Sequence, residues 1–234
     1  MAEKSISKPR ELLQLIIEDW TEIRKFTTCS WAKQQQFEML TMYERLCSEI
    51  DAAIAGARER GGGDEASEWR AGQTLLKSVV CELQMWLALK ESDAWSAWHS
   101  FCDAEQYAVN ARRWLPQSFE PAKDQVEHLR LVERIAFPYP AFFTSIAVLV
   151  GREVCTICES EYGTCAHLAG ELYDGEMCAR RCEEIKEALH LALVRNPSDK
   201  RLRLREPGGI DPPPRAESRP KKPRRAKSKR KRRR

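Results

Sequence analysis

Apolar residues recur at steps of three and four along most of the first 136 positions, which is the spacing of one face of an α-helix. Gly61, Gly62 and Gly63 interrupt this pattern, and Asp93 is a candidate N-cap at a second break. Short connections favour antiparallel packing of neighbours, above all of the two helices that flank Asp93. We therefore expect a mainly α protein in which residues 1–136 form an antiparallel helical bundle. The predicted helices span residues 9–29, 30–60, 64–89, 94–115 and 121–135.

The pattern changes after residue 136. Residues 141–150 form a short apolar run, and periodicity alone does not decide between a buried strand and a buried helix there. Leucines alternate with other residues over 189–194 and again over 202–204, on either side of a turn at 196–199. This alternation predicts a small β-hairpin, with a helix through 188–194 as the alternative. The segment 137–205 is thus expected to be a compact module that follows the bundle.

Composition favours a folded, non-membrane protein. Of the 234 residues, 42% are hydrophobic, which is enough to bury a core in one or two domains. No run of eighteen apolar residues occurs, and the first positions lack the apolar centre of a signal peptide. Nine cysteines without a secretory signal favour a reducing compartment. We therefore expect a cytoplasmic protein.

Charge is divided unevenly along the chain. The last forty residues hold 18 of the 39 Lys and Arg but only four acidic residues, so they carry a formal charge of +14 and the rest carries −10. From residue 206 onward, prolines and glycines interrupt a chain without apolar periodicity, as in disordered segments. We call residues 206–234 the basic tail and predict that it binds DNA or RNA without sequence preference. The expected contacts come from Arg219, Lys221, Lys222, Arg224, Arg225, Lys227, Lys229, Arg230, Lys231, Arg232, Arg233 and Arg234.

Five cysteines crowd into residues 155–182 and point to a metal site. Cys155 and Cys158 form a CxxC pair, and Cys165 and His167 follow closely, which supplies the four ligands that tetrahedral Zn²⁺ requires. Gly163 lies in the intervening loop, where tight turning is needed. Four protein ligands imply a structural zinc ion rather than a catalytic one. An iron–sulfur cluster or a redox CxxC fits this donor set and context less well.

The fourth ligand has alternatives. If residues 176–185 are helical, two further cysteines lie one turn apart there, and either could replace His167. We prefer the imidazole. The alternative ligands are Cys178 and Cys182.

The other cysteines, the histidines and the aromatic stripe have ordinary structural explanations. We expect the cysteines outside the cluster and the aromatic residues to pack in the core, and the histidines to be packing or surface residues. No phosphate-binding glycine loop, nucleophile elbow or paired Glu-x-x-His motif occurs, so an enzyme is disfavoured though not excluded. The cysteines outside the cluster are Cys29, Cys47, Cys81 and Cys102. The histidines are His99, His128 and His190, and the aromatic residues are Trp86, Trp95, Trp98, Phe101 and Tyr107.

The cysteine-rich segment resembles a family of bacterial proteins of unassigned activity. Their approximate pattern is CSxCGxxYxxCxHxxGxxYxGxxC, followed by a strand and a PADKR-like turn. The matching residues are Cys155, Cys158, Tyr162, Cys165, His167, Gly170, Tyr173, Gly175 and Cys178, then residues 194–201. The resemblance spans residues 137–205 and implies a metal-binding module in a bacterial cytoplasm, with Cys178 as an extra participant. Thr156, Glu159 and Ser198 depart from the pattern, and Glu159 replaces a glycine just after the second cysteine.

Together these features predict a non-catalytic accessory or adaptor protein. The helical bundle would bind a protein partner, zinc would order the module, and the basic tail would hold nucleic acid nearby. The alternative is a regulatory subunit of a larger complex that does not bind nucleic acid, because the acidic remainder of the chain neutralises its own tail.

Overall fold

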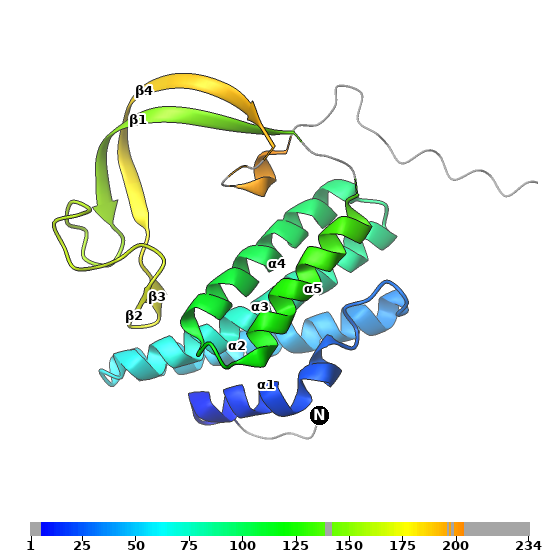
Figure 1. Ribbon diagram of the computed structural model, residues 1–234. Coiled ribbons are helices and arrows are strands. Elements are labelled where there is room, and N and C mark those ends of the chain that lie inside the picture. The colour runs from blue at the N-terminus through cyan, green and yellow to red at the C-terminus, as the bar shows by residue number, and fades with distance from the viewer. Residues whose placement is uncertain (1–5, 139–141, 196, 198, 204–234) are drawn as a thin grey trace, which may run out of the picture. The chain divides into compact units, whose positions relative to one another are not determined.

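A computed structural model describes residues 6–138, 142–195, 197 and 199–203. The described part is mainly helical, as the sequence predicts, and carries two antiparallel sheets of two strands each (Figure 1). None of its helices combines the length and the apolar character that crossing a membrane requires. The helices and strands are α1 (Pro9–Arg24), α2 (Lys33–Glu59), α3 (Gly63–Lys90), α4 (Ala94–Trp114), α5 (Glu120–Ala136), β1 (Phe143–Cys155), β2 (Leu172–Tyr173), β3 (Glu176–Met177), β4 (Arg180–Val194) and the 3₁₀ turn η1 (Lys200–Leu202).

Local hydrogen bonds set the helix ends. α1 ends at Arg24, earlier than predicted, because the amide and the hydroxyl of Thr27 both donate to the Arg24 carbonyl, at 3.0 and 2.8 Å. The Asp93 carboxylate accepts a hydrogen bond from the Ser96 amide at 2.9 Å, which confirms the predicted N-cap of α4. Gly61 takes a φ of 74°, and the turn between α2 and α3 depends on this left-handed conformation.

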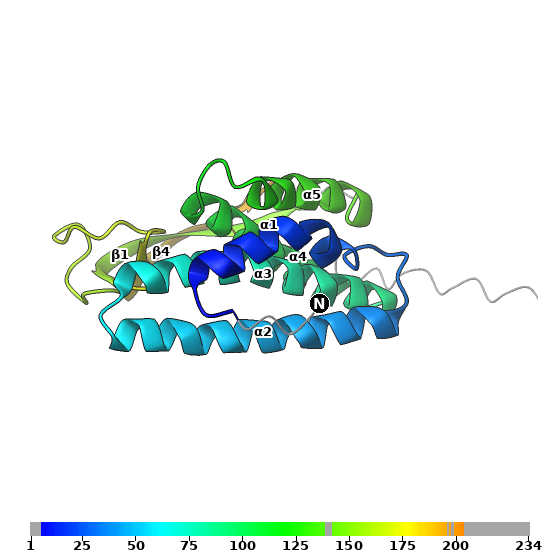
Figure 2. The same ribbon diagram turned by 90° about the horizontal axis from the view of Figure 1, so that it is seen from below.

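The core is organised around α3. This helix packs against α1, α2 and α4, and Figures 1 and 2 show α3 between α2 and α4. Because neighbours cover α3 on several sides, its predicted apolar positions, such as Leu75, Val79 and Leu83, are fully buried. A second apolar cluster joins α3, α4 and α5, where Trp98 stacks near Phe101 with ring centroids 5.6 Å apart. These two aromatic residues are core residues, as expected.

The expected core position of Trp95 is wrong, and some apolar residues of the predicted helices are also exposed. Phe37, Leu131 and Ile135 are about half exposed or more, and Trp95 is exposed. α5 buries the face that includes Leu129 and Val132, which packs toward α4. Leu131 and Ile135 lie outside this face and are exposed to solvent. α5 therefore has more apolar residues than buried positions, and its sequence pattern predicted too wide a buried face.

The open question at residues 141–150 is resolved for the described residues: Phe143 and those after it form β1. β1 pairs antiparallel with β4, from Phe143 opposite Val194 to Cys155 opposite Arg180. The strand predicted at 189–194 is therefore correct, but its predicted partner is wrong, since residues 200–202 form η1 and Leu204 lies outside the described residues. The leucine alternation identified one strand, while its true partner lay more than forty residues upstream, beyond the reach of local patterns.

Candidate metal centre

The candidate metal centre lies in the connection between β1 and β4. We call residues 155–178 the metal loop. Its ends are held together because Cys155 closes β1 opposite Arg180 at the start of β4. Inside the loop, β2 and β3 form a short hairpin in which Leu172 pairs with Met177 and Tyr173 with Glu176. The sheet thus closes the loop and brings together residues that are more than ten positions apart in sequence.

Four side chains of the loop converge on one point. One ligand atom from each of Cys155, Cys158, Cys165 and His167 lies within 4.8 Å of the others. The structure therefore brings together the four residues that the sequence selected, and this cluster could hold a metal ion. Its donors are three sulfurs and one imidazole nitrogen, a set that suits soft and borderline metals.

The turn between the first two cysteines is built for ligation. The Glu159 amide donates to the Cys155 carbonyl at 2.9 Å, and the Ile157 amide donates to Cys155 Sγ at 3.4 Å. Glu159 itself has a φ of 59°, in the left-handed region that favours glycine. Gly163 has a φ of 98°, in agreement with the tight turn expected there. The metal loop takes left-handed backbone at five positions, and two of them, Glu159 and Asp174, are not glycines.

Two tyrosines fix the backbone around the imidazole. The Tyr173 hydroxyl accepts a hydrogen bond from the Leu168 amide at 2.9 Å, and the Tyr162 hydroxyl accepts one from the Ala169 amide at 3.1 Å. The Tyr173 ring also meets the His167 ring edge to face, with centroids 4.6 Å apart. His167 Nδ1 is buried and has no hydrogen-bond partner among the described residues. A buried nitrogen without a partner is costly, and it is what a ligand histidine presents before metal binds.

The thiols of the cluster perturb one another. Burial alone would raise the pKa of Cys155, but hydrogen bonds from the backbone of Cys158 and Ile157 bring it down to about 7. The pKa of Cys158 is also lowered, chiefly by a backbone hydrogen bond from Ser160. For Cys165, a backbone hydrogen bond near His167 lowers the pKa, but burial and the neighbouring thiols outweigh it and the net pKa is raised. Thiolates this close repel one another, and a bound cation would relieve that repulsion.

The two alternative ligands have different positions. Cys178 is buried, with its Sγ 3.7 Å from Cys155 Sγ, and burial raises its pKa to about 11. Cys182 is exposed on β4, where its thiol lies 3.4 Å from the Glu184 carbonyl. The assumption that residues 176–185 are helical is wrong, because they belong to β3 and β4. In a strand, residues four apart do not meet as they do on a helix, so Cys182 falls outside the cluster.

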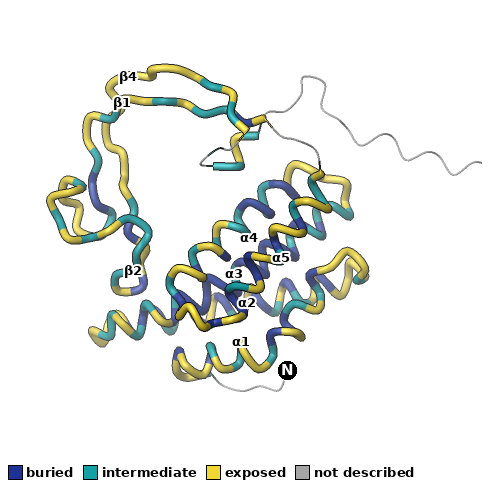
Figure 3. Tube along the Cα trace, in the orientation of Figure 1, coloured by how far each residue is buried: buried dark blue, intermediate teal, exposed yellow. Residues whose placement is uncertain are grey.

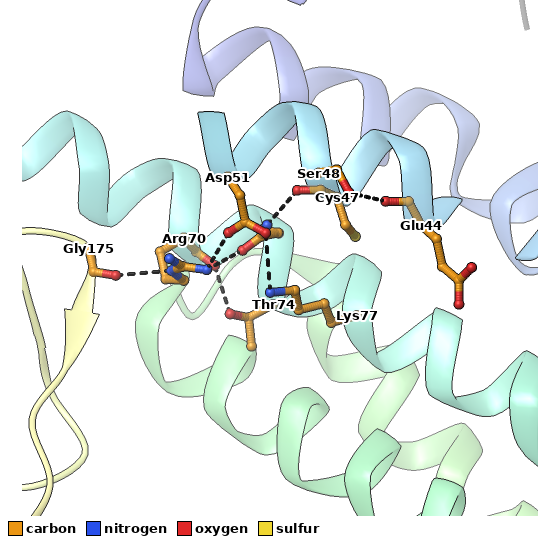
Figure 4. Close-up of polar contacts among 9 residues, drawn as sticks. Glu44, Cys47, Ser48, Asp51, Arg70, Thr74, Lys77 and Gly175 are labelled. Carbon is orange, nitrogen blue, oxygen red and sulfur yellow. Dashed lines mark hydrogen bonds and ion pairs between the residues drawn. The ribbon is translucent and has the colours of Figure 1, made fainter. Parts of the chain in front are cut away.

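The metal loop is hydrogen-bonded to the helices. Trp114 Nε1 of α4 donates to the Gly170 carbonyl at 2.8 Å, and the Gly175 amide donates to the Ser67 hydroxyl at 3.0 Å. Figure 4 shows Arg70 reaching from α3 to the Gly175 carbonyl, at 3.0 Å, and to Asp51 of α2, at 2.9 Å. These bonds use backbone groups of the loop, so they require its folded path. No pattern in the sequence predicted these hydrogen bonds between the loop and the helices.

Most of the other cysteines behave as the sequence predicts. Burial raises the pKa of Cys47 to about 11 and those of Cys81 and Cys102 to about 12 each, as expected for core thiols. Cys29 is an exception: it is exposed, because α1 ends before reaching it. The basic-tail residues that are predicted to bind nucleic acid, from Arg219 to Arg234, lie outside the described residues.

A buried polar cluster between α3 and α5 was not predicted. Glu82 is fully buried, and its carboxylate lies 2.6 Å from His128 Nε2 and accepts a hydrogen bond from Gln125 Nε2 at 2.9 Å. His128 therefore has a defined buried partner and is not a simple surface residue. A glutamate within an apolar helix face was the only available signal in the sequence.

Comparison with known proteins adds no relative: no protein-family model, curated protein or solved structure matches this chain. The resemblance of residues 137–205 to a bacterial family remains a prediction that rests on the motif alone.

Proposed function

We propose that this chain is a non-catalytic adaptor protein with a structural zinc ion, a helical surface for a protein partner and a tail for nucleic acid. The observation that carries the proposal is the convergence of Cys155, Cys158, Cys165 and His167, whose ligand atoms lie within 4.8 Å of one another. The metal identity, the partners and the absence of catalysis are parts of the proposal.

Zinc is the metal that this donor set favours. Three thiolates and one imidazole are a common ligand set of structural zinc sites. Four protein ligands complete a tetrahedron, which leaves no coordination position for the water that a catalytic zinc ion activates. Cys178 lies beside Cys155 but is not among the four residues whose ligand atoms converge, so we propose no metal bond for it. This assignment supports a structural role.

The metal loop also has a physical need for a metal. Among its residues only Cys155, Gly175 and Cys178 are buried, so the loop has almost no apolar core. Segments this small usually depend on metals or disulfides for stability. Zinc would hold the path that the contacts of Gly170 and Gly175 with the helices require. Metal binding and docking of the loop on the helices are then coupled.

The basic tail supports the second half of the proposal. Twelve of its last sixteen residues are Lys or Arg, and none is acidic. Such a segment releases counterions from nucleic acid, so its binding should be independent of sequence and steeply dependent on salt. Tethering a partner to the same chain raises the local concentration of that partner on the polymer.

The test combines metal analysis with nucleic-acid binding on one preparation. Full-length protein is compared with a version that ends at Glu206, with Cys155→Ser, and with the control Cys182→Ser, which changes an exposed thiol outside the cluster. We expect one zinc per chain in all except Cys155→Ser. Binding of duplex DNA or RNA should fall by at least about 10³-fold between 50 and 200 mM salt and vanish on truncation.

The outcomes separate the alternatives. A protein purified without metal, or a Cys155→Ser variant that retains zinc, would overturn the site. Zinc without nucleic-acid binding would instead favour a regulatory subunit whose tail pairs with its own acidic residues.

A further inference from the structure

β4 is a long strand with an uncovered edge. Among the described residues it pairs only with β1, so the backbone groups along its other side have no strand partner. Such edges are templates for pairing with another chain. A two-stranded ribbon on its own is also marginally stable in water, and further strands stabilise it.

One face of this ribbon is apolar and open to solvent. Ile146, Leu189, Leu191 and Leu193 are 55–66% exposed, and Figure 3 shows exposed residues along both strands. Ile146 lies opposite Leu191 in the ladder, so apolar side chains from the two strands share this face. Phe143 is on the other face and is buried in the second core cluster. The leucines therefore lie on the face of the ribbon that the helices leave open to solvent.

Protective features are confined to the first half of β4. Charged residues occupy most of positions 180–187, and charge is a common device against edge pairing. From Ala188 to Val194 the strand carries no Asp, Glu, Lys or Arg. From His190 to Val194 it pairs with β1 without a register shift. This stretch offers an uncharged edge, and the register shift of the ladder lies just before it, at Leu189.

The sequence of this edge is complementary to itself. If two copies run antiparallel about Leu191, the two Leu191 residues face each other and Leu189 lies opposite Leu193. In the same register Glu187 lies opposite Arg195, twice in the pair. Moving the centre to Ala192 would instead place Arg195 opposite a leucine. Opposite charges across neighbouring strands stabilise a sheet, so they select the first register.

We propose that β4 pairs with β4 of a second copy of this chain, antiparallel and centred on Leu191. The two ribbons form one four-stranded sheet, and its apolar face is shared between the copies. The arrangement is symmetric and closed, so the dimer pairs both β4 edges and leaves no β4 edge for a third copy. This inference does not depend on zinc or nucleic-acid binding.

The test measures the mass of the full, zinc-loaded and nuclease-treated chain by analytical ultracentrifugation over a range of concentrations. We expect a species of about twice the 27.0 kDa chain mass that dissociates on dilution. Leu191→Lys places two like charges opposite each other and should weaken dimerisation by about a hundredfold. The matched control is Ile135→Lys, which changes an equally exposed apolar residue on α5 and should leave dimerisation unchanged.

Charge reversal tests the register. Glu187→Arg and Arg195→Glu should each weaken the dimer by about tenfold, and the double variant should restore it. Zinc content and circular dichroism check that each variant is folded. A monomer at all concentrations, a dimer insensitive to Leu191→Lys, or a double reversal that fails to restore binding would each overturn the proposal. The last two outcomes would point to another surface or another register.

Discussion

The buried pair of Glu82 and His128 makes a quantitative prediction about stability. Glu82 is fully buried, and one carboxylate oxygen lies 2.6 Å from His128 Nε2. Replacing His128 with Ala leaves this oxygen without its partner, while Gln125 still donates to the other at 2.9 Å. Leaving a buried acceptor without its partner costs about 1–3 kcal/mol, and more when the group is charged, so we expect a loss of about 3 kcal/mol.

The surroundings of Glu82 support the same estimate. Burial lowers the pKa of Arg24, and the negative charges of Glu82 and Asp124 act against this lowering. The guanidinium therefore offsets part of the cost of an unpaired carboxylate. A loss of about 3 kcal/mol in a domain of this size corresponds to a decrease in Tm of about 6–12 °C.

Urea and thermal unfolding of the zinc-loaded chain measure the effect. The matched control is Glu127→Ala, which truncates the exposed neighbour of His128 on α5 and should leave stability nearly unchanged. His128→Gln keeps an N–H donor and should cost less than His128→Ala. The double variant Glu82→Leu with His128→Leu should recover most of the loss, because apolar residues replace both members of the pair. A His128→Ala variant within about 1 kcal/mol of the Glu127→Ala control would refute the reasoning.

Three further predictions concern the metal loop and the reactivity of the thiols. Glu159→Gly removes left-handed strain of about 1 kcal/mol and should raise the chelator concentration needed to strip the metal; easier stripping would contradict this. Removing the metal with a chelator should expose the metal loop to protease while the helical circular dichroism signal stays; a loop that remains resistant would argue against a structural ion. In the native metal-loaded protein an alkylating reagent followed by mass spectrometry should label the exposed thiols first, and early labelling of a core thiol would show that the helices open. The thiols expected to react first are Cys29 and Cys182, and the protected ones are Cys47, Cys81 and Cys102.

Local sequence signals predicted most of the helical fold. The spacing of apolar residues located all the α-helices of the described part, and Asp93 and the glycine run marked breaks correctly. The same signals failed where a segment depends on distant partners. Nothing near Leu191 indicates that its strand pairs with Ile146, and nothing in the apolar spacing of α5 shows that Ile135 is left exposed.

The cluster of four ligands was predictable for a different reason. The ligands lie within thirteen consecutive residues, so short-range turns suffice to bring them together. Cys178 reaches the same place only because β1 and β4 close the loop, and its distance of 3.7 Å from Cys155 depends on that pairing. Sequence alone could not separate Cys178 from Cys182, because the distinction requires knowing that residues 180–194 form a strand.

The contacts of the ribbon explain why its middle is exposed. At one end, Phe143 and Val194 pack in the core cluster of α4 and α5. At the other end, the metal loop is hydrogen-bonded to the helices through Gly170 and Gly175. A ribbon held at two separate ends does not need the side chains between these ends for attachment. The side chains of Ile146 and its neighbours are therefore free to contact another molecule. Loss of the metal should release only one end, so an apo protein should keep the aromatic contacts of Phe143 while losing the bonds of the metal loop.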